Sequence, residues 1–155
     1  KTDKATLDTP TCHGYYNLTG SEGNPVNSHL LQVGAEKKAT TNPDVTTTGE
    51  FTQVAGTKFD FRTLKEIGAT TLDDPFVLHH ENDYDLTITS PDQAVSMQIK
   101  TDSDAIILYI TGTHEEGTPM KNGTMVARGS IAIEPQGIPG AEKFSQYETT
   151  YHIAY

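Results

Sequence analysis

The chain has little cysteine, few basic residues and no long apolar segment. Its single cysteine, Cys12, excludes an intramolecular disulfide and a zinc cluster built on cysteines, and it favours the cytoplasm over secretion. Eleven basic against 21 acidic residues give a net charge of -10, which repels the phosphates of nucleic acids and anionic lipid headgroups. No apolar run approaches the roughly 18 residues of a membrane span, and the N-terminus lacks the apolar core of a signal peptide. We therefore expect a soluble chain without a nucleic-acid or membrane partner.

The apolar pattern is that of β-strands. Three stretches place large apolar residues at every second position: Tyr84, Leu86 and Ile88; Val95, Met97 and Ile99; and Tyr151, Ile153 and Tyr155. Clusters of glycine, proline, asparagine and aspartate separate such stretches, which is typical of turns in an all-β chain. The best helical candidate, residues 61–67, spans only about two turns and is too short to be stable alone. We predict one antiparallel β-sandwich domain over residues 1–155, with its chemistry on a concave face or on loops.

Glu134 is the sharpest candidate for proton transfer. Alternation places Ile131 and Ile133 on one face of a strand and Ala132 with Glu134 on the other, and the proline that follows is expected to end the strand. A carboxylate at a strand end facing a cleft can have its pKa raised by desolvation, which suits a general base. The competing interpretation is an exposed glutamate at the edge of a sheet.

Other candidates also have two interpretations. His13 is either an acid–base group beside Tyr15 and Tyr16 or a hydrogen-bonded structural residue. Asp73, with the aspartate after it, is either a binding carboxylate or part of a turn before proline. The tyrosines Tyr15, Tyr16 and Tyr109 can stack on the apolar face of a sugar ring or serve as sheet and core aromatics.

A metal site is not expected. The neighbouring His79 and His80 would point to opposite faces of a strand, so they cannot easily bind one ion.

Several ordered segments resemble the aldose 1-epimerase family, the galactose mutarotases. Residues 11–18, Thr-Cys-His-Gly-Tyr-Tyr-Asn-Leu, resemble its His-x-Tyr-Phe-Asn-Leu signature. Residues 48–50 match its Thr-Gly-Glu segment, and residues 56–62 match its Gly-Thr-x-Phe-Asp-Phe-Arg segment. Residues 73–78 are similar to its Asp-His-x-Phe block, residues 108–112 to its Tyr-Thr-Gly strand, and residues 132–136 to its Leu-Glu-x-Gln block. The resemblance covers nearly the whole chain.

The resemblance implies a large antiparallel β-sandwich that interconverts the α and β anomers of free aldoses such as galactose or glucose. By position, it assigns Glu134 as the general base that acts on the anomeric hydroxyl and His13 as the general acid that protonates the ring oxygen, on opposite sides of the ring. Asp73 would hold sugar hydroxyls, with Tyr15 and Gln136 as further substrate contacts. Neither a metal nor another cofactor is implied, because the reaction has no redox step.

The family domain is about twice as long as this chain, which matches its C-terminal half. In that family the N-terminal half supplies a second histidine and an arginine to the pocket. The resemblance therefore implies that a companion chain supplying the N-terminal half is a possible partner. A non-catalytic carbohydrate-binding β-sandwich module is the alternative function.

Overall fold

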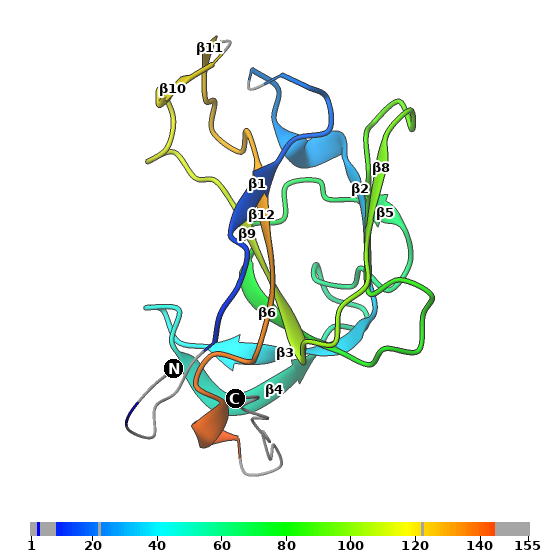
Figure 1. The fold of residues 1–155 in the computed structure, drawn as a ribbon, viewed down its shortest axis with the longest axis vertical. Coiled ribbons are helices and arrows are strands. Elements are labelled where there is room, and N and C mark those ends of the chain that lie inside the picture. The colour runs from blue at the N-terminus through cyan, green and yellow to red at the C-terminus, as the bar shows by residue number, and fades with distance from the viewer. Residues whose placement is uncertain (1–2, 4–8, 22, 122, 145–155) are drawn as a thin grey trace.

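The computed structural model describes residues 3, 9–21, 23–121 and 123–144, which form short strands joined by turns (Figure 1). Two short 3-10 helices also occur in this part of the chain, η1 (Val26–Ser28) and η2 (Ala141–Lys143). The strands, in chain order, are β1 (Gly14–Tyr16), β2 (Leu30–Val33), β3 (Ala35–Thr41), β4 (Thr47–Gln53), β5 (Lys65–Glu66), β6 (Asp73–Leu78), β7 (Leu86–Thr89), β8 (Ser96–Ile99), β9 (Ala105–Ile110), β10 (Pro119–Met120), β11 (Gly123–Thr124) and β12 (Ile131–Gln136). None of the helices described is long and apolar enough to cross a membrane.

The strands form two main antiparallel sheets. The larger sheet has six strands in the order β1-β12-β9-β6-β3-β4, and the smaller has four in the order β5-β2-β7-β8. Strands β10 and β11 form a separate two-stranded ribbon. Figure 1 shows the two main sheets on opposite sides of the molecule, with β1 and β12 running side by side although they come from opposite ends of the chain.

The core lies between the two main sheets. Leu31 and Ile88 from the smaller sheet pack in one cluster with Phe76, Leu108 and Ile133 from the larger sheet, and each is at most 1% exposed. Burying one such side chain contributes about 1.5–3 kcal/mol relative to leaving it in water. The predicted all-β sandwich is therefore confirmed.

The alternating stretches are only partly strands. Leu86 and Ile88 are buried in β7 as expected, but Tyr84 precedes that strand and is 45% exposed. Val95 is 49% exposed, because it belongs to the turn before β8, where its N–H donates to the Ser90 hydroxyl. The prediction was therefore wrong for Tyr84 and Val95. The stretch at 151–155 lies outside the described residues.

Residues 61–67, the best helical candidate, are not a helix. The Phe61 ring is buried in the core, and Lys65–Glu66 pair with β2 as the edge strand β5. Before them, the Arg62 guanidinium donates to both carboxylate oxygens of Asp60 at 2.8 and 2.9 Å. The second Asp60 oxygen also accepts from the Gly56 N–H at 3.0 Å, so this family-like segment folds as a closed turn.

The Thr-Gly-Glu segment has a packing role in the described structure. Gly49 has a φ of +96°, and a Cβ added there would lie 2.7 Å from the backbone oxygen of Lys143 in η2. Only glycine accommodates both this backbone conformation and the close approach of η2 to β4.

Candidate active site

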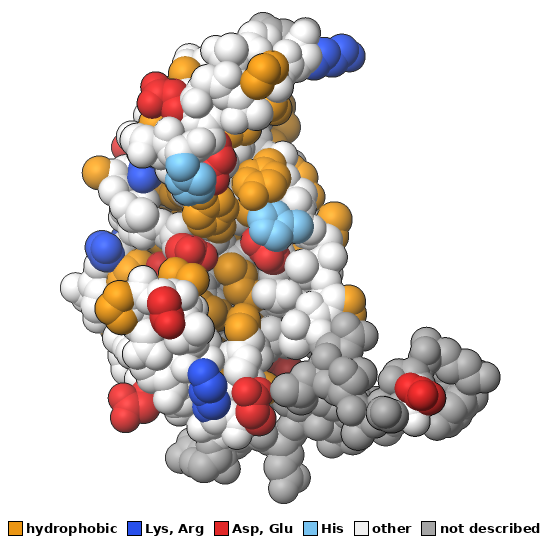
Figure 2. Space-filling view, turned by 90° about the vertical axis from the view of Figure 1, so that its left-hand side faces the viewer, with side chains coloured by type: hydrophobic (Ala, Val, Ile, Leu, Met, Phe, Trp, Pro, Cys, Tyr) orange, Lys and Arg blue, Asp and Glu red, His pale blue; other side chains and the backbone are white. Residues whose placement is uncertain are grey.

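A pocket of about 430 Å³ opens on the outer face of the larger sheet. That size falls within the range of small-molecule sites, about 300–1,000 Å³. Its polar walls carry three carboxylates, from Asp73, Glu115 and Glu134, together with His13 and Gln136. The rest of its lining is Tyr15, Val45, Pro75, Ile107, Tyr109 and Pro139. Figure 2 shows one face of the molecule on which acidic and histidine side chains surround a hollow that contains apolar side chains.

One row of side chains across the sheet forms the aromatic end of the pocket. Tyr15 on β1 pairs with Ala132 on β12, Ala132 pairs with Tyr109 on β9, and Tyr109 pairs with Asp73 on β6. Directly paired residues point to the same face of a sheet, so this row turns two tyrosines and a carboxylate outward. Ala132, between them in the row, is small and fully buried, and the two tyrosine rings lie 6.5 Å apart between centroids.

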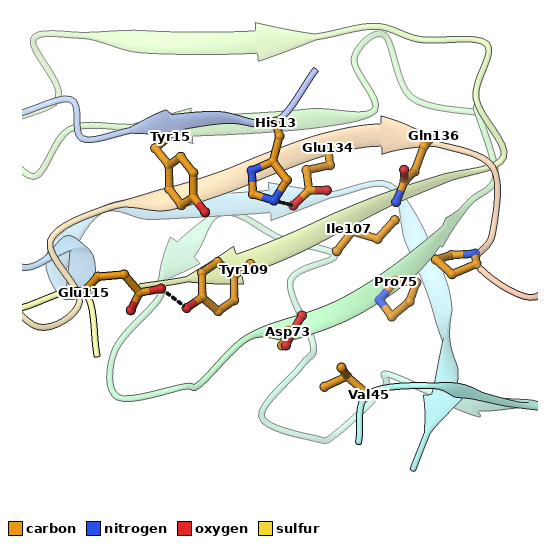
Figure 3. Close-up of a pocket in the computed structure, with 11 residues that line it drawn as sticks. His13, Tyr15, Val45, Asp73, Pro75, Ile107, Tyr109, Glu115, Glu134 and Gln136 are labelled. Atoms are coloured by element: carbon orange, nitrogen blue, oxygen red, sulfur yellow. Dashed lines mark hydrogen bonds and ion pairs between the residues drawn. The ribbon is translucent and has the colours of Figure 1, made fainter. Parts of the chain in front are cut away.

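The next row carries the charged pair. Glu134 on β12 pairs with Ile107 on β9, which pairs with Pro75 on β6. His13 comes one residue before β1, and its Nε2 atom lies 3.0 Å from Oε1 of Glu134. Gln136 lies two residues beyond Glu134 on the same face of β12 (Figure 3).

Strand β12 does not end at Glu134. It continues through Pro135 to Gln136, which corrects the expectation that the proline stops the strand. Within the described part of the chain, pairing between β1 and β12 reaches only as far as Ile133, so β12 is an edge strand there beyond that point. Proline is tolerated on an edge because no further strand needs its missing N–H.

His13 and Glu134 differ strongly in their access to water. The His13 side chain is 50% exposed, whereas that of Glu134 is 9% exposed. Burial raises the pKa of Glu134, the charge of Asp73 raises it further, and His13 lowers it. A carboxylate with a raised pKa is a better proton acceptor than a surface glutamate, provided that it is ionised.

The contact between His13 and Glu134 differs from the expectation of an acid and a base on opposite sides of a sugar ring. The two side chains touch at 3.0 Å on one wall of the pocket. Figure 3 shows Glu134 projecting from β12 and His13 from the adjacent segment before β1, toward the same space. The expected separation of the acid and the base is therefore not observed, and the two side chains are in direct contact.

Asp73 lies at the start of β6 rather than in a turn. Burial raises its pKa, and the neighbouring Asp74 carboxylate raises it further. Asp74 points into the protein, where it forms an ion pair of 2.6 Å with the buried Lys38 ammonium group. The two adjacent aspartates therefore separate into one that lines the pocket and one that is paired within the protein.

Tyr109 is linked to a loop carboxylate that motif reasoning missed. Its hydroxyl donates to Oε1 of Glu115 and lies 3.1 Å from Nε2 of His114. Burial, followed by the hydrogen bond to Glu115, raises the pKa of Tyr109 to about 12. Burial also acts to raise the pKa of Glu115, but the hydrogen bonds from Tyr109 and from the Gly112 N–H outweigh it and lower that pKa.

All five residues predicted for the site line this one pocket: His13, Tyr15, Asp73, Glu134 and Gln136. Tyr109, considered only as a stacking candidate, lines it as well, whereas Tyr16 on the opposite face packs against the core. Glu115 was missed because it lies in a glycine- and proline-rich stretch that predicts only a turn.

The paired histidines at 79 and 80 have separate partners. His80 Nδ1 lies 3.0 Å from the buried Asp85 carboxylate, and His79 Nδ1 accepts the Glu81 N–H. Across the described residues, no three histidine, cysteine, aspartate or glutamate side chains are grouped so that they could hold a metal ion.

Comparison with known proteins identifies one family. The family model for aldose 1-epimerase matches residues 1–148. An aldose 1-epimerase of Haemophilus influenzae is 29% identical over 159 residues, covering 94% of this chain and 46% of that protein. A maltose epimerase of Levilactobacillus brevis is 24% identical over 152 residues, covering 91% of this chain and 43% of its own length.

Solved structures give the same result. The GalM/aldose epimerase homologue from C. elegans superimposes with a TM-score of 0.80 at 26% identity, covering 91% of this chain and 45% of that one. Galactose 1-epimerase from Lactobacillus acidophilus gives a TM-score of 0.74 at 28% identity, covering 89% and 42%. The chain thus spans somewhat less than half the length of the proteins that it matches.

Proposed function

The chain belongs to the aldose 1-epimerase family, and from this membership and the His13–Glu134 contact we propose that it carries the acid and base of a mutarotase. Its substrates would be free aldoses, such as galactose or glucose, whose α and β anomers it interconverts. In this proposal the chain forms part of a single β-sandwich domain and corresponds to the C-terminal half of the family fold.

The pocket has the chemistry that a sugar requires. The Asp73 carboxylate accepts hydrogen bonds, and a sugar presents many hydroxyl donors. The exposed ring of Tyr15 and the amide of Gln136 supply an apolar surface and a further polar contact. In this proposal Asp73, Tyr15 and Gln136 hold the sugar while His13 and Glu134 act on it.

The reaction is an exchange of protons at one end of the ring. Glu134 takes the proton of the anomeric hydroxyl while His13 gives a proton to the ring oxygen, and the bond from the anomeric carbon to that oxygen breaks. The open aldehyde rotates about its bond to the next carbon. Closure on the other face then reverses both proton transfers and yields the other anomer.

The close contact of His13 and Glu134 suits this chemistry. The anomeric hydroxyl and the ring oxygen are bonded to the same carbon, so the acid and the base that serve them need not stand on opposite sides of the sugar. Two groups that are 3.0 Å apart on one wall can reach two oxygens attached to one atom. This distance is the observation on which the proposal depends most.

The half of the family fold that this chain does not match is also expected to contribute to the site. Strand β1, which bears Tyr15 and follows His13, is an edge of the larger sheet as far as the structure describes the chain. Groups from the rest of the family fold would therefore complete the pocket from beyond β1, whether they belong to the same polypeptide or to a companion chain. Gel filtration with intact mass analysis of the purified protein distinguishes these arrangements.

Polarimetry tests the proposed activity. Freshly dissolved α-glucose or α-galactose should lose its excess optical rotation faster with the purified protein than in buffer, and Glu134→Gln should remove the acceleration. The exposed Glu116 provides a matched control, since Glu116→Gln makes the same chemical change outside the pocket. Sugar binding by calorimetry without any acceleration would instead assign the chain to the carbohydrate-binding alternative.

A further inference from the structure

The loop after β9 carries Glu115, whose carboxylate is hydrogen-bonded to the end of β9 and to the start of the loop. Oε2 of Glu115 accepts the Gly112 N–H at 2.7 Å, while Oε1 accepts the hydroxyl of Tyr109, the penultimate residue of β9. His114 Nε2 lies 2.6 Å from the same Oε1. A Cβ on Gly112 would lie 3.0 Å from the His114 ring, so glycine keeps this arrangement compact. The loop is thus fastened to Tyr109 by several contacts at once.

Tyr109 in turn contacts Tyr15, which projects from the same face of the larger sheet. Its ring meets Tyr15 edge to face, with centroids 6.5 Å apart and planes at 81°. Tyr15 is 49% exposed, so packing from other elements holds only part of its ring. Edge-to-face contacts between aromatic rings stabilise a pair by about 0.5–1.5 kcal/mol beyond the buried area. The position of Tyr15 therefore depends on Tyr109.

Tyr15 in turn contacts the acid of the proposed reaction. The Tyr15 and His13 rings lie 5.0 Å apart between centroids at an angle of 37°, and His13 contacts Glu134. Because the His13 side chain is half exposed, its contacts with Tyr15 and Glu134 restrict the direction of its imidazole. Figure 3 shows the path along one side of the pocket from Glu115 through Tyr109 and Tyr15 to His13.

We infer that Glu115 is a positioning residue for the acid–base pair: through Tyr109 and Tyr15 it sets the orientation of the His13 imidazole. The inference rests on the proposed mutarotase function, since it assigns a role within that same site. Glu115 acts here through other side chains and not on the reacting atoms.

The kinetic test compares Glu115→Ala with Glu116→Ala, which alters the adjacent exposed glutamate of the same loop. A misplacement of about 1 Å can lower a rate about 100-fold, and a loosened His13 should lower kcat about tenfold. KM should change less than kcat does, because Asp73 and Gln136, two of the three proposed sugar contacts, do not depend on Glu115 for their positions. Tyr109→Phe, which keeps the ring but loses the hydroxyl, should reproduce the fall in kcat, and Glu115→Gln, which keeps an acceptor, should restore much of it. A rise in KM at constant kcat in Glu115→Ala would overturn the inference, because Glu115 would then act as a sugar ligand.

A second readout does not need activity. In NMR spectra, the cross-relaxation between the His13 and Tyr15 ring protons should weaken in Glu115→Ala and persist in Glu116→Ala. If the purified protein lacks mutarotase activity but this difference is seen, the proposed function fails while the positioning contact stands. An unchanged His13–Tyr15 signal in a folded Glu115→Ala variant would overturn the inference whatever the activity.

Discussion

The side chains of Glu134 and His13 are in contact at 3.0 Å, and the carboxylate is nearly buried while the imidazole is half in water, at 9% and 50% exposure. Burial raises the pKa of the Glu134 carboxyl group, whereas the His13 imidazole is open to solvent. The proposed base is thus shielded from water, and the proposed acid is accessible to it.

Replacing Asp73 should change the pH at which the rate falls in acid. Glu134 must be ionised to act, so activity falls as the pH drops through its raised pKa. Asp73 raises that pKa by charge repulsion, and Asp73→Asn should therefore move the acid limb of kcat to lower pH. A pH series of polarimetric rates measures the shift. Movement of the limb to higher pH would contradict this electrostatic account.

The buried ion pair beneath Asp73 should matter for folding. Lys38 and Asp74 are 9% and 10% exposed, so Lys38→Met leaves an unpaired carboxylate inside the protein. Removing one partner of such a pair typically lowers the free energy of unfolding by about 3–5 kcal/mol. Urea unfolding at pH 7 measures the loss. The double variant Lys38→Met, Asp74→Leu should recover most of it, whereas an equal loss in both variants would mean that the unpaired charge is not the cause.

Asp85 predicts a pH dependence of stability. Burial acts to raise its pKa, but hydrogen bonds from the Thr101 N–H, His80 and Lys100 outweigh that effect and lower it. A carboxylate whose pKa is lower in the folded state stabilises the fold above its unfolded pKa, and this contribution is lost as the pH falls through the folded pKa. Asp85→Asn should therefore lower the free energy of unfolding by about 1–3 kcal/mol at pH 7. The difference from wild type should shrink in acid, and a constant difference across the pH range would refute the linkage.

Replacing Gly49 should lower the stability of the fold through packing, and Gly49 has no part in the proposed chemistry. In Gly49→Ala the new Cβ meets the Lys143 backbone, and the residue keeps a strained φ of +96°, so we expect a loss of about 1–3 kcal/mol. Gly20→Ala separates the two effects, because Gly20 has a φ of +70° with nothing within 4 Å of the added Cβ. Thermal unfolding should show the larger loss for Gly49→Ala. Equal losses would indicate that the contact with η2 contributes nothing.

The sequence predicted the site best where strand alternation decided which way a side chain points. In β12, Ile133 is in the core and Glu134 faces the pocket, as the period of two requires. The family-like segments then placed the remaining predicted site residues on the same face. Alternation could not show that His13 and Glu134 touch, because the pairing of β1 with β12 joins distant parts of the chain.

Alternation failed at the ends of strands and in loops. Tyr84 and Val95 continue an apolar period but lie before strands β7 and β8, and the Val95 N–H donates to the Ser90 hydroxyl. Glu115 carries no motif, and only the folding of its loop back onto Tyr109 brings it into the pocket. Such contacts depend on tertiary structure and leave no periodic signal in the sequence.

The central claim is that His13 and Glu134 act as one acid–base unit on an aldose. A double-mutant cycle in mutarotation rate, with His13→Gln, Glu134→Gln and both together, tests it most directly. Groups that act as a unit are strongly non-additive, so each single variant should lose about 100-fold or more and the double variant should be little worse than either. Single variants that retain nearly full rate, or losses that simply multiply in the double variant, would contradict it.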